Sequence, residues 1–144
     1  MRKGKIEMAK EEYVVVWAPT KAGENFIKLL KFKGIKVAGI TNSQMGKSRL
    51  EELGIEHCIL ADTSHPNTWN LPPFPVGRVY LFESSLTLCC RYIQMCRSWT
   101  RKPIFVITTS INPRLVYKGL GAKYVIYSHS GDVAFLADKS ALLE

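Results

Sequence analysis

The sequence predicts an α/β fold: a doubly wound parallel sheet with helices on both faces. Two observations support this. Short continuous apolar runs, such as the one that ends at Trp17 and the one at 104–107, are typical of strands buried on both faces of a parallel sheet. Segments with apolar residues three or four positions apart alternate with these runs, as expected when each helix connects two parallel strands.

The elements follow in a regular order along the chain. Strands are expected at 13–17, 35–40, 55–61, 78–82, 104–108 and 123–127. Helices are expected at 24–33, 46–53, 86–99, from 112–113 to Gly119 or Gly121, and at 132–143. Glycines 34 and 54 end two helices, and Pro113 suits a first helical turn because its missing N–H is not needed there. The predicted strand order is 3-2-1-4-5-6.

Length and composition indicate one globular domain. The 144 residues are expected to form a polar N-terminal tail at 1–12 and a domain at 13–144. Hydrophobic residues make up 47% of the chain and charged residues 22%, which is ordinary for a folded domain. The net charge of +8 is dispersed without a run of five or six like charges. It indicates solvated helix faces, and nucleic acid is not an expected partner.

The four cysteines do not form a metal-binding pattern. Cysteines 58, 89, 90 and 96 contain no C-x-x-C pair, and the three histidines are scattered along the chain. We expect free thiols and no metal site, which fits a reducing cytoplasm. The sequence shows no signal peptide and no apolar run long enough for membrane insertion, so a cytoplasmic location is predicted.

The first strand, turn and helix have the layout of a dinucleotide-binding unit. Its fingerprint is G-x-G-x-x-G, and the three glycine positions hold Ala18, Thr20 and Gly23. Pro19 removes a backbone donor, and Glu24 falls in the first helical turn, where it would repel an anion. The side chains of Thr20 and Lys21, together with Gly23, remain candidates for contact with a phosphate. The unit therefore predicts a degenerate, weakly binding phosphate loop.

The end of the second strand lacks the acidic residue that binds ribose in such units. The sequence has Thr41, Asn42 and Ser43 in its place, with Lys47 and Arg49 nearby. The missing carboxylate weakens the case for NAD, and the cations make a 2′-phosphate tolerable. A weakly bound NADP or NAD is therefore the candidate cofactor, and the open alternative is a Rossmann scaffold that is kept for packing or association and binds no cofactor. Glu83, after the fourth strand, is a further binding candidate, although the segment 83–85 equally suits a helix cap.

The second half of the chain resembles a known family. The segment from Asn112 to Ile126, with its helix, Gly-Ala pair and following strand, resembles the TrkA-N domain, the nucleotide-binding part of RCK (regulator of potassium conductance) proteins. Asp62 and Thr63, after the third strand, resemble the short motif that lies beside the adenine in that family. The resemblance covers roughly 13–140 and implies a Rossmann-like domain with a nucleotide pocket coupled to subunit contacts. The first 65 residues are also similar to atypical short-chain dehydrogenases.

The sequence lacks the two enzyme signatures that this fold class suggests, and no catalytic residue is assigned. A reductase of the short-chain type needs Tyr-x-x-x-Lys, and no tyrosine of this chain is followed by lysine four positions later. A phosphoacceptor domain needs an acidic pair after the first strand, where Trp17 and Ala18 stand. Among the histidines, His65 is a better functional candidate than His57, and Trp69 could cover a ligand or pack on the sheet.

Two functions remain open. The first is a non-enzymatic nucleotide-sensing or protein-interaction module with a degenerate NAD(P)-binding site. The alternative is an NADP-dependent reductase or epimerase-like enzyme of the atypical short-chain dehydrogenase type. The helix at 86–99 is apolar over more of its surface than one sheet face covers, so a homodimer is expected.

Overall fold

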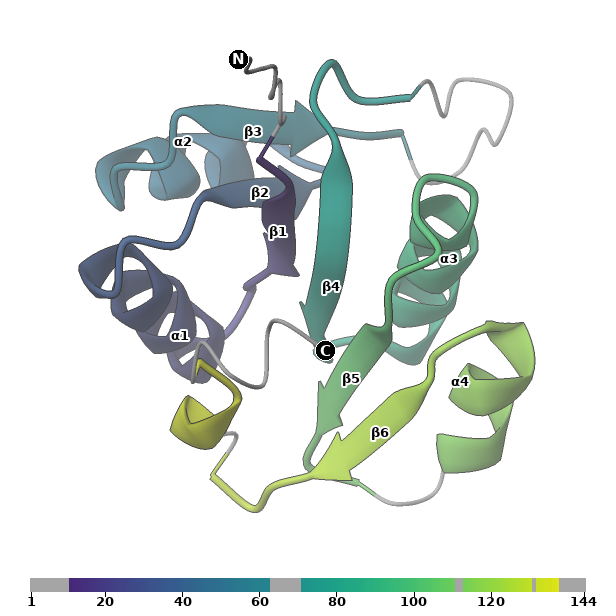
Figure 1. The fold of residues 1–144 in the computed structure, drawn as a ribbon. Helices are drawn as coiled ribbons and strands as arrows, with labels where there is room; N and C mark the ends of the chain where they lie inside the picture. The colour runs from purple at the N-terminus through teal and green to yellow at the C-terminus, as the bar shows by residue number, and fades with distance from the viewer. Residues whose placement is uncertain (1–10, 63–70, 111–112, 131, 138–144) are drawn as a thin grey trace, which may run out of the picture.

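The fold is a six-stranded parallel sheet of order β3-β2-β1-β4-β5-β6, as the sequence predicts (Figure 1). The computed structural model describes residues 11–62, 71–110, 113–130 and 132–137. The strands are β1 (Tyr13–Trp17), β2 (Val37–Thr41), β3 (His57–Leu60), β4 (Val76–Phe82), β5 (Ile104–Thr108) and β6 (Tyr124–Tyr127). The helices are α1 (Lys21–Phe32), α2 (Gln44–Glu52), α3 (Leu86–Arg97) and α4 (Arg114–Leu120), followed by a 3-10 turn, η3 (Ala134–Ala137).

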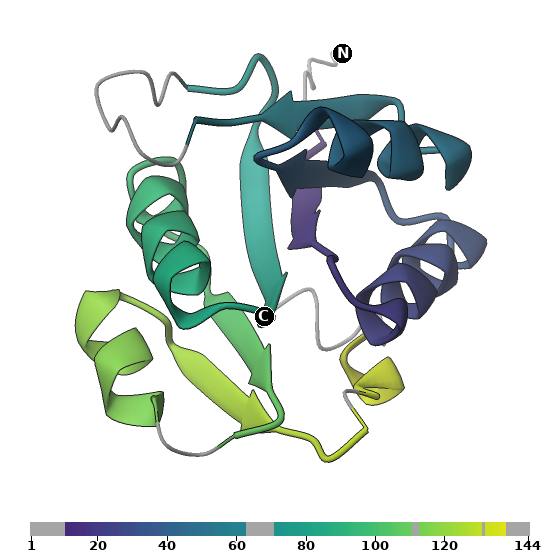
Figure 2. The ribbon, with the colours of Figure 1, turned by 180° about the vertical axis from the view of Figure 1, so that it is seen from behind.

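Two hydrophobic clusters lie on opposite faces of the sheet, because successive strand residues point to opposite sides. Val14 and Val16 of β1 pack in one cluster with α1, α2 and η3. Val15 and Trp17 pack in the other cluster with α3 and α4. The two views of the ribbon show α3 and α4 together, away from α1 and η3 (Figures 1 and 2). This three-layer arrangement confirms the predicted doubly wound fold.

Polar side chains define where three helices begin. The Thr20 hydroxyl accepts a hydrogen bond from the Gly23 amide at 3.1 Å, and the Ser43 hydroxyl accepts one from the Gly46 amide at 3.0 Å. Ser85 caps α3 in the same way through the Leu88 amide, at 3.3 Å. These caps place the starts of α1 and α2 two or three residues earlier than expected from apolar spacing alone.

Both ends of the chain lie largely outside the described residues. Of the N-terminal tail expected at 1–12, the structure describes Glu11 and Glu12, which are exposed. Of the helix expected at 132–143, the described part shows a single 3-10 turn, begun by Asp132, whose carboxylate accepts a hydrogen bond from the Ala134 amide at 3.1 Å. Residues 138–143 lie outside the described part of the chain.

The apolar surface of α3 is covered from two sides. Five residues of the helix are buried: Cys89, Tyr92, Ile93, Met95 and Cys96. The sheet covers one side of the helix, and α4 covers another through Tyr117, which belongs to the same hydrophobic cluster. The excess apolar surface noted in the sequence is therefore mostly accounted for within the chain, and Leu86, with 51% exposure, remains at the start of the helix.

Candidate functional site

A pocket of about 300 Å³ lies at the carboxyl ends of β1 and β2. The sheet order reverses between β1 and β4, and such reversals are where open α/β sheets bind ligands. The polar wall of the pocket includes Glu24, Thr41, Asn42, Ser43, Arg49 and Ser84, and the apolar wall includes Trp17, Ile40, Met45, Leu53 and Leu88. Its volume is at the lower end of the range for small-molecule pockets.

Sequence reasoning did not identify Met45, Leu53 or Leu88 as part of this site. Leu53 and Leu88 are periodic apolar residues of helices, so their pattern alone indicates core packing. Ser84 belongs to the segment 83–85, which the sequence offered either as a ligand-binding end of the fourth strand or as a helix cap, and its place in the pocket wall fits the first of these.

The surviving glycine of the loop is required by packing. A Cβ on Gly23 would lie 2.8 Å from Ala18 Cα and 3.1 Å from Phe82 Cγ, so α1 approaches β1 and β4 too closely for a larger residue. The Gly23 amide already donates its hydrogen bond to the Thr20 hydroxyl. Gly23 and Thr20 thus have structural roles that do not depend on a phosphate.

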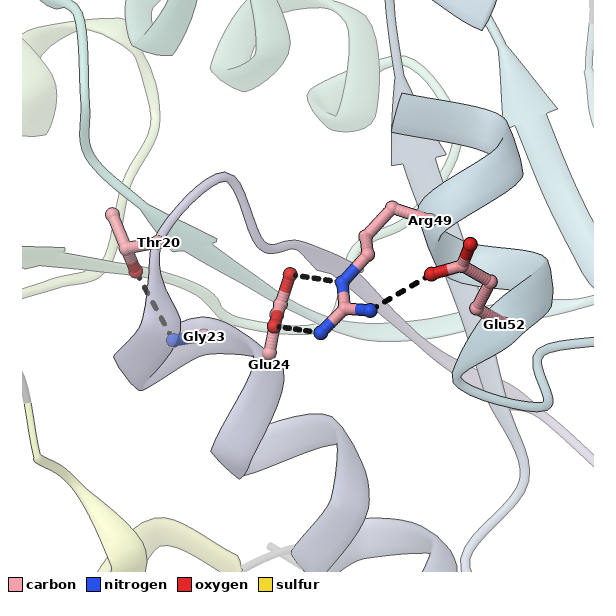
Figure 3. A network of polar contacts seen from close by, with 5 residues as sticks. All are labelled: Thr20, Gly23, Glu24, Arg49 and Glu52. Carbon is pink, nitrogen blue, oxygen red and sulfur yellow. Dashed lines mark hydrogen bonds and ion pairs between the residues drawn. The ribbon is translucent and has the colours of Figure 1, made fainter. Parts of the chain in front are cut away.

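The acid in the first turn of α1 is paired with an arginine of α2 (Figure 3). Arg49 Nε donates to Glu24 Oε2 and Arg49 Nη2 to Glu24 Oε1, each at 2.8 Å. Arg49 Nη1 donates to Glu52 at 2.8 Å. The hydrogen bonds from Arg49 hold the pKa of Glu24 below its usual value, and the two carboxylates raise the pKa of Arg49. Glu24 was expected to repel an anion, but the guanidinium of Arg49 balances its negative charge.

The end of β2 contributes a compact polar turn. Thr41 is buried, and its hydroxyl accepts a hydrogen bond from the Ser43 amide at 3.4 Å. A Cβ on Gly46 would lie 2.1 Å from Thr41 Oγ1, so α2 sits directly on this turn. The structure brings Thr41, Asn42 and Ser43 together on one wall of the pocket.

Glu83 faces a different part of the sheet edge. It lines a neighbouring hollow of about 440 Å³ with Leu86, Pro113 and Val116. The Thr108 hydroxyl donates to Glu83 at 2.6 Å, and the Tyr117 hydroxyl donates to its other oxygen. Burial and the hydrogen bond to Glu83 raise the pKa of Tyr117. Ser84 links the two hollows, since it lines both.

The remaining candidates are dispersed. Lys21 lines a third hollow of about 550 Å³, between α1 and the segment 130–134. Asp62 follows β3 and is exposed. The His57 ring packs against Tyr13 at 4.9 Å and Phe74 at 5.4 Å between ring centroids, as expected of a packed histidine. Thr63, His65 and Trp69 lie outside the described residues.

Cys89 and Cys96 are buried, and Cys58 and Cys90 are partly buried. All four are free. Burial raises the pKa of Cys58, Cys89 and Cys90, and that of Cys96 to about 12, so the thiol form predominates at neutral pH. Across the described ranges, no group of three or more His, Cys, Asp or Glu side chains is placed to hold a metal ion. No helix in the described part of the chain is long and apolar enough to cross a membrane.

Comparison with known sequences gives no relative. No family model matches the chain, and no curated protein matches its sequence.

Comparison with solved structures gives several neighbours of the same fold. The NAD(P)-binding domain of an exopolyphosphatase-related protein from Archaeoglobus fulgidus has a TM-score of 0.67 and 21% identity, covering 93% of this chain and 96% of that one. The TrkA-N domain of the inner membrane protein ybaL from Escherichia coli has a TM-score of 0.64 and 13% identity, covering 94% and 99%.

The GsuK channel bound to NAD is a further neighbour, with a TM-score of 0.64 and 12% identity. The match covers 84% of this chain and 22% of the channel chain. These neighbours are TrkA-N and RCK-type NAD(P)-binding domains, so the fold implied by the sequence resemblance is confirmed. The chain has the Rossmann-like fold that TrkA-N and RCK domains share.

Proposed function

We propose that the chain is a nucleotide-sensing module that binds an NADP- or NAD-type nucleotide weakly and reversibly. The observation that carries this is the pocket at the switch point of a Rossmann-like sheet, lined by the ends of β1 and β2 and the first turns of α1 and α2. Neighbours of the same fold have been solved with NAD or ADP bound, which supports a nucleotide as the ligand class.

Weak binding follows from the donors available at the start of α1. A phosphate at a helix N-terminus is held mainly by backbone amides. Pro19 has no amide hydrogen, and the Gly23 amide already bonds to Thr20. The carboxylate of Glu24 also lies in the first turn. An incoming phosphate therefore meets fewer backbone donors and an arginine, Arg49, that is already paired with Glu24, so we expect dissociation constants in the micromolar range or higher.

A regulatory role fits the pocket better than catalysis. Among the residues that the structure describes, the titratable side chains that line it are Glu24 and Arg49, and each is engaged by the other. Neither is poised to transfer a proton near neutral pH, because the pKa of the acid is lowered and that of the base is raised. The alternative, a reductase or epimerase, has fold-level support from a putative NAD-dependent epimerase/dehydratase from Bacillus halodurans, with a TM-score of 0.56 and 16% identity.

We also propose that the module acts as a homodimer in the cytoplasm. Leu86 at the start of α3 and Leu115 and Val116 on α4 are 51%, 78% and 51% exposed, and Leu86 and Val116 border the hollow beside Glu83. Association through this surface would connect the nucleotide pocket to a subunit contact through Ser84. Four free thiols fit a reducing compartment.

Calorimetric titration with NAD, NADP, ATP, ADP and AMP tests the proposal. We expect saturable binding of at least one nucleotide, with no turnover when NADPH is supplied with a panel of carbonyl substrates. Turnover of any substrate would favour the enzyme, and absence of binding at millimolar nucleotide would remove the proposed function.

A further inference from the structure

We propose that Arg49 is a binding residue for a phosphate on the ribose 2′ position, and that Glu24 occupies it in the absence of ligand. The inference rests on the proposed function, because it concerns the same pocket. It narrows the ligand class to 2′-phosphorylated adenine nucleotides, and it adds a mechanism by which Glu24 competes with the ligand for Arg49.

The first step is the geometry of Arg49. Its guanidinium presents two parallel N–H groups to both oxygens of Glu24, at 2.8 Å each. This is the arrangement by which arginine recognises carboxylates and phosphates alike, so the same donors suit a phosphate. Figure 3 shows the guanidinium reaching from α2 towards the first turn of α1, and both side chains line the pocket.

The second step is the position of Arg49 relative to a sugar. In sheets of this kind the ribose lies over the end of the second strand, where an acid normally accepts its 2′-hydroxyl. Here that turn offers Thr41, Asn42 and Ser43, none of which is anionic, and Arg49 faces the same pocket from α2. The charge at the ribose position is therefore reversed, which favours a 2′-phosphate over a 2′-hydroxyl.

The third step is that a phosphate can displace Glu24. The Arg49 side chain is 46% exposed and the Glu24 side chain 15%, so a phosphate can reach the guanidinium from solvent and compete with the carboxylate for it. A phosphate monoester carries more negative charge near neutral pH than a carboxylate. The remaining bond to Glu52, from a different nitrogen, would keep the guanidinium in place during the exchange.

A pair of isomeric ligands separates this site from the start of α1. We would titrate 2′-AMP and 5′-AMP, which have the same charge and differ in phosphate position, into wild type, Glu24→Gln and Arg49→Gln at fixed salt. Wild type should bind 2′-AMP severalfold more tightly. Glu24→Gln should raise that preference to about tenfold or more, because Arg49 is released. Arg49→Gln should abolish the preference in both the wild-type and Glu24→Gln backgrounds.

Matched variants control for net charge. Glu51→Gln, on the exposed side of α2, makes the same charge change as Glu24→Gln, and Lys33→Gln, at the end of α1, makes the same change as Arg49→Gln. Both should leave the ratio of the two affinities unchanged, and circular dichroism would confirm that every variant is folded. Lys47→Gln tests the other cation of α2.

The outcomes distinguish the two proposals. Binding with equal affinity for the isomers in wild type and Glu24→Gln, or a preference lost in Lys47→Gln but retained in Arg49→Gln, would overturn the role of Arg49 and leave the nucleotide module intact. Failure of every nucleotide to bind to every folded variant would overturn the nucleotide module itself.

Discussion

Tyr117 donates its hydroxyl hydrogen to the carboxylate of Glu83 and so ties α4 to the end of β4. The Tyr117 side chain is fully buried, and Glu83 also accepts a hydrogen bond from Thr108 at the end of β5. One carboxylate therefore joins two strands and a helix at the edge where the sheet carries its pockets.

Removal of this hydroxyl should destabilise the fold. Tyr117→Phe leaves a partly buried carboxylate with one hydroxyl donor fewer, and we expect a loss of about 1–3 kcal/mol in the free energy of unfolding, measured in urea. Tyr124→Phe is the control, since Tyr124 is 42% exposed on the edge strand β6 and should change stability little. Equal stability of Tyr117→Phe and wild type would show that the hydroxyl contributes nothing.

Two glycine substitutions should have opposite effects. Gly23→Ala places a methyl group 2.8 Å from Ala18 and should destabilise the fold by about 1–3 kcal/mol. Gly119→Ala, inside α4, has nothing within 4 Å of the new Cβ and should stabilise by about 0.5–1 kcal/mol. Thermal unfolding of both variants checks this. If Gly23→Ala kept its stability and lost only nucleotide binding, the glycine would belong to the ligand site.

The stability contributed by the Glu24–Arg49 pair should depend on pH in one direction. The pKa of Glu24 is lowered from its usual 4.5 in the folded state, so the contribution is complete above that value and is lost as the pH falls through the folded-state pKa. Wild type should therefore exceed Glu24→Gln in stability at pH 7, and the difference should shrink as the pH falls below 4.5. Urea unfolding at pH 7 and at a series of lower pH values tests the sign. A stability difference between wild type and Glu24→Gln that grows at acidic pH would contradict a stabilising Glu24–Arg49 pair.

The proposed dimer surface can be tested by charge insertion. Leu115→Glu should convert a dimer to a monomer in light scattering at high micromolar concentration, because an apolar contact would then bury a carboxylate. Phe32→Glu is the matched control, since Phe32 is 88% exposed at the far end of α1. A monomeric wild type would reject the dimer, and a dimer that persists in Leu115→Glu would place its interface elsewhere.

Local patterns predicted the sheet because strands buried on both faces appear in the sequence as short continuous apolar runs. The strands at 13–17 and 104–108 were predicted to the residue, and the strand order follows from the alternation of strands and helices. Helix starts were less accurate, because the capping by Thr20 and Ser43 was not weighed against apolar spacing.

The site was harder to predict because its decisive contacts are long-range. Glu24 was expected to repel an anion at the start of α1, but it is paired with Arg49, which comes from the next helix. Gly23 was interpreted as the remnant of a phosphate loop, whereas Phe82, far along the chain, helps explain why it must be glycine. Neither relationship can be deduced from residue spacing in one sequence.

The close packing of α2 on Thr41 limits which substitutions the pocket can accept. Thr41 Oγ1 lies where a Cβ on Gly46 would come within 2.1 Å, so a larger acid at position 41 would have to displace the helix. Asn42 is exposed on the same wall and differs from aspartate by one atom. A change of ligand preference towards an unphosphorylated ribose should therefore start with Asn42→Asp, which supplies a carboxylate without moving the backbone.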